Sequence, residues 1–165
     1  MSDITDAQTL AATNAATDAA AITAGSFGAA ETVKAPTETV AATNVLTKAE
    51  SGKTCFLSSA TEFVSTLPAP VAGLEFEFIV AAAPSGASYT VVTASSANII
   101  KGHILTNDVN SATDADFEVS GGDTLSFVDS KAVAGDRARF ISDGTNWFVQ
   151  ASCTVFDAIT ITTAS

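Results

Sequence analysis

The chain has 165 residues, with seven Lys or Arg against eighteen Asp or Glu, which gives a formal net charge of −11 and an isoelectric point of about 4.1. This charge repels phosphate backbones and anionic lipid surfaces, so nucleic acid and membranes are not expected as partners. The opening MSDITD lacks the basic and apolar regions of a signal peptide, and no apolar stretch is long enough to span a bilayer, so we expect a soluble protein made in the cytoplasm.

Residues 1–45 differ in composition from the rest of the chain. Ala and Thr dominate them, and Phe27 is their only aromatic residue. Such a segment cannot build a core by itself, and its Ala-rich stretches would form at most a marginal helix. We therefore expect residues 1–45 to be an N-terminal arm that orders on a partner or a neighbouring subunit, and residues 46–165 to be a β-domain.

Short runs of alternating apolar residues follow one another from residue 46 onward, separated by turn residues. In residues 74–80, apolar side chains alternate with Glu75 and Glu77, so one side of this strand should face a core while the glutamates keep the other side soluble. The predicted strands are residues 53–59, 61–67, 74–80, 88–94, 97–102, 117–120, 123–129, 136–143, 145–151 and 154–163. This pattern predicts an all-β domain, an antiparallel β-sandwich or jelly roll, with a barrel as the alternative.

The stretch FISDGTNWFVQA, residues 140–151, predicts a hairpin around Asp143 and Gly144. Alternation along its second strand separates the two neighbouring aromatic residues. Trp147 shares a face with apolar residues and is expected in the core. Phe148 lies among polar residues and is the candidate for a subunit interface, where aromatic side chains are enriched.

Residues that could carry chemistry are few. His103 is the only histidine, and no nucleophile motif accompanies it, so we expect it to be structural or solvent-facing. Cys55 and Cys153 are almost a hundred positions apart without metal-ligand spacing, and they are expected to be two buried thiols. No catalytic, cofactor-binding or metal-binding residue is predicted.

Two groups of charged residues could also be read as binding sites, but they have simpler interpretations. Asp114, Asp116 and Glu118 alternate, as calcium ligands can, but they lack the spacing and central glycine of a calcium loop. A solvated acidic rim is therefore the prediction for them. Arg137 and Arg139 flank the tryptophan hairpin, and in an acidic chain we expect them to pair with carboxylates.

Several short motifs occur in a fixed order between residues 46 and 151. They are Ser51-Gly52-Lys53 before Cys55-Phe56-Leu57, Leu67-Pro68 followed by Gly73, Lys101-Gly102-His103, and Gly135-Asp136 leading to Asp143-Gly144 and Trp147. This order resembles a small β-domain found in structural proteins of tailed bacteriophages, above all head decoration (cement) proteins, and also in some fibre and tail components.

The resemblance implies a virion protein, made in the host cytoplasm, that assembles as a homotrimer. It would bind the major capsid protein on the outer surface of the head and stabilise the shell, without a cofactor and without enzymatic activity. The alternative is a tail fibre or receptor-binding domain, in which loops such as residues 106–116 would contact the host surface.

Overall fold

The computed structural model describes residues 35–59, 61–106 and 117–163, and the side chains of residues 117–120 are not described. The chain divides into residues 1–34 and a β-domain that begins at Ala35. The domain therefore starts eleven residues before the predicted start at residue 46. Ala and Thr are frequent in residues 35–45, but Thr is a good strand former. Residues 37–40 and 44–45 each form a short strand that pairs with a neighbouring strand of one of the two sheets.

Twelve strands and two short 3₁₀ helices make up the described part of the domain. They are β1 (Thr37–Val40), β2 (Asn44–Val45), η1 (Lys48–Glu50), β3 (Lys53–Leu57), β4 (Phe63–Thr66), β5 (Glu75–Val80), β6 (Tyr89–Val92), η2 (Ala94–Ser96), β7 (Ile100–Thr106), β8 (Phe117–Gly122), β9 (Thr124–Phe127), β10 (Arg137–Ser142), β11 (Trp147–Cys153) and β12 (Ile159–Thr162). The predicted strands are found with shifted ends, and β1 and β2 were not predicted.

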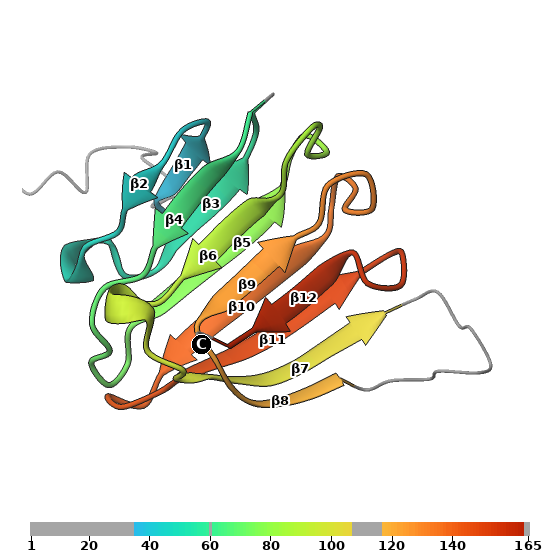
Figure 1. Cartoon of the computed structure of the whole chain (residues 1–165). Coiled ribbons are helices and arrows are strands. Elements are labelled where there is room, and N and C mark those ends of the chain that lie inside the picture. Colours follow the sequence, from blue (N-terminus) through green and yellow to red (C-terminus); the bar gives the residue numbers. More distant parts are fainter. Residues whose placement is uncertain (1–34, 60, 107–116, 164–165) are drawn as a thin grey trace, which may run out of the picture. The chain divides into compact units, whose positions relative to one another are not determined.

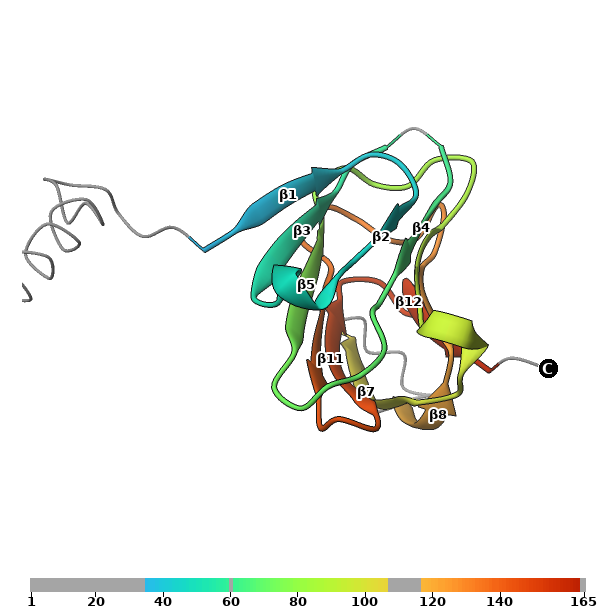
Figure 2. The same cartoon turned by 90° about the vertical axis from the view of Figure 1, so that its left-hand side faces the viewer.

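The strands form two sheets that lie face to face, so the predicted all-β sandwich is confirmed (Figure 1). A seven-stranded sheet has the order β1-β3-β5-β10-β11-β7-β8, and a five-stranded sheet has the order β12-β9-β6-β4-β2. Figure 2 shows the two layers from a second direction. Because the central strands of the larger sheet are β5, β10, β11 and β7, segments far apart in the sequence lie side by side.

Both sheets are mixed, not wholly antiparallel as the sequence suggested. The chain alternates between the sheets from β1 to β6, so β1, β3 and β5 run parallel in one sheet, as do β2, β4 and β6 in the other. The pair β11 and β7 is also parallel. A strand that crosses to the second sheet and returns enters the first sheet in its original direction, whereas a hairpin reverses it.

The core lies between the two sheets and is built from the alternate residues of each strand. Phe76, Phe78 and Phe140 are fully buried on the inner face of the seven-stranded sheet, and Trp147 is buried beside them. The ring centroids of Phe76 and Trp147 are 5.9 Å apart, and those of Phe78 and Phe140 are 5.7 Å apart in an edge-to-face arrangement. The prediction that Trp147 belongs to the core is confirmed.

The predicted hairpin joins β10 to β11, with Ser142 opposite Trp147. The Asp143 carboxylate accepts hydrogen bonds from the backbone N–H groups of Thr145 and Asn146, both at 2.7 Å. These bonds favour the ionised form and lower the pKa of Asp143. Gly144 has a φ of 100°, a conformation that other L residues rarely adopt. The turn signal in the sequence thus corresponds to an actual turn.

Gly102 allows β7 to approach β11 closely. A Cβ atom at this position would lie 2.0 Å from the carbonyl oxygen of Val149, and the φ of Gly102 is 144°. The pairing of β7 with β8 is irregular at the same place, between Ile100 and Gly102. Only glycine fits this position without displacing β11.

Asp136 is a buried carboxylate, with 2% of its surface exposed, at the start of the β10 and β11 hairpin. One of its oxygens accepts a hydrogen bond from the N–H of Val133 at 2.9 Å, and the other accepts one from the N–H of Thr154 at 2.8 Å. Its backbone oxygen accepts a bond from Val80. This single residue therefore connects the turn before β10, the segment after β11 and the end of β5.

Candidate functional site: the outer face of the seven-stranded sheet

The outer face of the seven-stranded sheet carries the side chains of β5, β10, β11 and β7 that point away from the core. Strand pairing arranges them in three rows that cross the four strands. In strand order the rows are Glu75, Ile141, Phe148 and Lys101; Glu77, Arg139, Gln150 and His103; and Ile79, Arg137, Ser152 and Leu105. We call these twelve residues the outer face.

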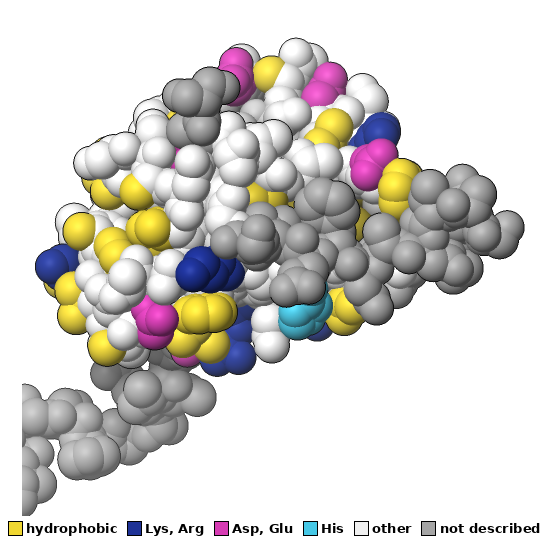
Figure 3. All heavy atoms as spheres, turned by 60° about the horizontal axis from the view of Figure 1, so that its bottom comes forward, with side chains coloured by type: hydrophobic (Ala, Val, Ile, Leu, Met, Phe, Trp, Pro, Cys, Tyr) yellow, Lys and Arg dark blue, Asp and Glu magenta, His cyan; other side chains and the backbone are white. Residues whose placement is uncertain are grey.

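The outer face combines charged and exposed apolar side chains. Phe148 is 46% exposed, Ile141 is 38% exposed and Leu105 is 50% exposed. Figure 3 shows the histidine with hydrophobic and basic side chains beside it. Ile141 and Phe148 are adjacent in the first row, and such an exposed apolar pair makes this face a candidate interaction surface. The exposure of Phe148 agrees with its predicted outward direction, and its role in an interface stays a prediction.

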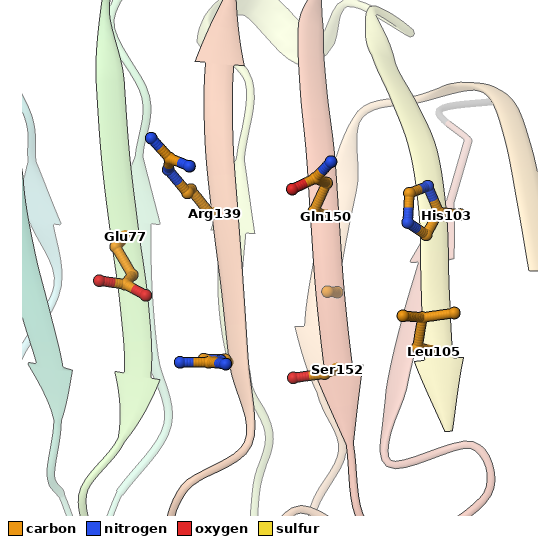
Figure 4. Close-up of a pocket in the computed structure, with 8 residues that line it drawn as sticks. Glu77, His103, Leu105, Arg139, Gln150 and Ser152 are labelled. Atoms are coloured by element: carbon orange, nitrogen blue, oxygen red, sulfur yellow. The ribbon is translucent and has the colours of Figure 1, made fainter. Parts of the chain in front are cut away.

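A shallow groove of about 480 Å³ runs over the second and third rows. Figure 4 shows that its labelled side chains, among them Glu77, Arg139, Gln150 and His103, stand on four adjacent strands and project to the same side of the sheet. The groove therefore lies on the surface of the sheet between rows of side chains, and it is lined by hydrogen-bonding groups and by Leu105.

The two arginines of the groove differ in their partners. The Nε–H of Arg139 donates to Glu75 Oε1 at 2.7 Å, and this bond lowers the pKa of Glu75. Both side chains are more than a third exposed, so solvent screens the pair and it contributes little to stability. Arg137 forms no ion pair with any of the described residues. The predicted pairing with carboxylates is thus confirmed for Arg139 and not found for Arg137 within the described ranges.

His103 is half-buried in β7 and lines the groove, with Gln150 as its neighbour on β11. This agrees with the prediction of a structural or solvent-facing histidine. The register places Ser152 opposite Leu105, one row away from the imidazole. Within the described residues, no hydrogen bond of the kind that joins a nucleophile to its base is found between Ser152 and His103.

Cys55 and Cys153 are both buried and both free, as predicted. Burial raises the pKa of Cys55 to about 11 and also raises the pKa of Cys153. The Cys153 thiol donates a weak hydrogen bond to the carbonyl of Leu105 at 3.7 Å. A buried thiol with a raised pKa is a poor nucleophile, so these residues act as small core side chains.

The predicted acidic rim lies largely outside the described residues, because Asp114 and Asp116 are not described and Glu118 is described only through the backbone of β8. Within residues 35–59, 61–106 and 117–163, no group of three or more His, Cys, Asp and Glu side chains could hold a metal ion. In the same ranges no helix has both the length and the apolar character to cross a membrane.

A second polar cluster fixes the edge of the seven-stranded sheet. The Lys53 ammonium bonds Glu38 at 2.7 Å and also contacts Glu50, which in turn accepts hydrogen bonds from Thr47 at the start of η1. These contacts lower the pKa of Glu50 to about 2, mainly through Lys53. The cluster joins β1 and η1 to β3, and its role is structural.

The sequence reasoning found members of the outer face separately but missed the face as a whole. Lys101 was named only as part of a motif, and Ile141 and Leu105 were not singled out. Alternation within each strand shows that they point outward, but which strands are neighbours was not known, so no signal in the sequence could group them.

No protein-family model, no curated protein and no solved structure matches this chain.

Proposed function

We propose that this chain is a non-enzymatic structural protein of a tailed bacteriophage virion, a decoration protein that binds the major capsid protein on the outside of the head. Two things support the proposal. The motif order of residues 46–151 resembles that of decoration proteins. The β-domain also presents a broad face of mixed apolar and charged side chains, and this face is the single structural observation that carries the proposal.

The form of the groove favours binding over catalysis. Its charged and polar side chains lie along straight rows on a sheet, and the described thiols are buried with raised pKa values. An enzyme of this size would need side chains that converge on one reacting atom. Rows of side chains suit contact with another protein surface instead.

The test is binding to phage heads. Purified full-length protein is mixed with heads that lack it, before and after expansion, and sedimented through a density step. We expect saturable co-sedimentation with many copies per head and increased resistance of the shell to heat or to osmotic shock. Naked phage DNA serves as the control, and the acidic chain should not bind it.

Protein that stays in the supernatant with every form of head would overturn the proposal. Antibody labelling of intact virions tests location separately. Label on the tail, at a few copies per particle, would instead support the tail fibre or receptor-binding alternative.

A further inference from the structure

We propose that the outer face is a two-fold contact between two copies of this chain. The proposal rests on the order of the side chains in the three rows, which strand pairing determines. A two-fold axis that lies in the plane of the contact, parallel to the strands and between β10 and β11, places each row against its own reversed copy. A face can pack on itself in this way only if the two ends of every row are complementary.

The first row meets this condition through charge and apolar character. Glu75 is at its β5 end, Lys101 is at its β7 end, and Ile141 and Phe148 lie between them. Reversal places Glu75 opposite Lys101 of the partner subunit and Ile141 opposite Phe148 of the partner subunit. Two exposed apolar side chains thus meet at the centre, with an ion pair on each side of them.

The second row is also complementary when it is reversed. Glu77 lies opposite His103 of the partner subunit, and an imidazole N–H can donate to a carboxylate. Arg139 lies opposite Gln150 of the partner subunit, whose side-chain oxygen can accept from the guanidinium.

The third row follows the same rule. Ile79 lies opposite Leu105 of the partner subunit, so two apolar side chains meet. Arg137, which has no ion pair among the described residues, lies opposite the hydroxyl of Ser152 of the partner subunit. In none of the three rows do two like charges face each other, and in none does an apolar side chain face a charged one.

The geometry of sheets allows the contact. An axis parallel to the strands keeps the facing strands aligned, and aligned packing at about 10 Å separation is a common arrangement of two sheets. Four strands about 4.8 Å apart and three rows about 6.8 Å apart give a flat patch of roughly 400 Å² per subunit. A standard interface buries about 800 Å² per partner, so we expect a weak dimer that dissociates readily on dilution.

The experiment is sedimentation of the full-length protein over concentrations from about 1 μM to about 1 mM, with the charge variants Glu75→Lys, Lys101→Glu and the double swap. Within one subunit the two positions are three strands apart, about 14 Å, so their effects should add unless a second subunit brings them together. Lys48→Glu makes the same change of charge as Lys101→Glu but lies in η1, outside the four strands, and is the matched control. Unfolding curves confirm that each variant is folded.

We expect a concentration-dependent dimer, or a larger assembly with an even number of subunits. Lys101→Glu and Glu75→Lys should each weaken the contact at least about tenfold, and the double swap should restore most of the affinity. Lys48→Glu should leave the affinity unchanged. Loss of the Glu75 and Arg139 ion pair is common to Glu75→Lys and the double swap, so it cancels when these two variants are compared.

A wild-type protein that is monomeric or trimeric at every concentration would overturn the two-fold contact, as would a dimer whose affinity the double swap does not restore. The outer face cannot contact a second copy and the capsid protein at the same time, so the two-fold contact belongs to the free protein and binding to heads competes with it. Dimers that ignore phage heads would contradict only the decoration function, and Lys101→Glu monomers that still bind heads would be consistent with both.

Discussion

Asp136 is the buried residue whose replacement gives the sharpest test of how this domain is held together. Its carboxylate accepts two backbone N–H bonds, from Val133 at 2.9 Å and from Thr154 at 2.8 Å. The sequence distance between these donors shows that the carboxylate joins two separate loops. We consider the change of Asp136 to Asn, which conserves the shape of the side chain.

The expected cost follows from the donors and acceptors. An amide oxygen can replace one carboxylate oxygen, but the amide nitrogen then faces a backbone N–H, so one hydrogen bond is lost and two donors oppose each other. Hydrogen bonds to charged groups contribute about 1.5 to 3 kcal/mol each, so Asp136→Asn should lower the free energy of unfolding by roughly 2 to 3 kcal/mol. For a domain of this size the melting temperature should fall by roughly 6 to 12 °C.

The assay is urea and thermal unfolding at neutral pH, followed by the fluorescence of the buried Trp147. Asp157→Asn is the matched control, because Asp157 is exposed and its only described ion pair, with Lys131, is long at 3.8 Å. That change should cost less than about 0.5 kcal/mol. An Asp136→Asn protein that unfolds at the wild-type midpoint would refute the role assigned to the carboxylate.

Three further predictions concern other elements. Gly102→Ala should destabilise the domain by several kcal/mol or prevent folding, since its Cβ would lie 2.0 Å from a carbonyl oxygen of β11. Gly52→Ala is the control, because the space around its Cβ is open, and it should cost only about 1 kcal/mol. Equal melting temperatures of the two variants would contradict this. Glu50, with its pKa lowered to about 2, should stabilise the fold fully above pH 4.5 and lose this contribution as the pH falls toward 2. Lys53→Met should reduce this pH dependence of the free energy of unfolding, measured by urea titrations. Cys55 and Cys153 should not react with a thiol reagent at pH 8 until urea unfolds the domain, and fast labelling of the native protein would disprove their burial.

Several features of the fold could be predicted because they depend on local geometry. The period of two along a strand separates inward from outward side chains, so Trp147 was correctly placed in the core and Phe148 on the surface. Gly144 after an aspartate was enough to predict the turn before β11. The two cysteines are buried because they lie on the inward side of β3 and β11.

The start of the domain was predicted less well. Residues 35–45 are rich in Ala and Thr, and composition assigned them to the arm. In the structure β1 pairs in parallel with β3 from Thr37 onward, and Lys53 holds Glu38 beside it. A short edge strand of this kind is stabilised by the strand that it pairs with, so its own sequence is a weak signal.

The sequence by itself determined the class of the fold, the inward and outward sides of most strands and the position of the hairpin turn, because each depends on neighbouring residues. Only the tertiary structure decided the order and direction of the strands. Glu75 and Arg139 are 64 residues apart and form an ion pair only because β5 lies beside β10. Glu75 and Lys101 end the same row only because β10 and β11 insert between β5 and β7. That order arises from the way the loops cross between two sheets, which a period of two does not encode.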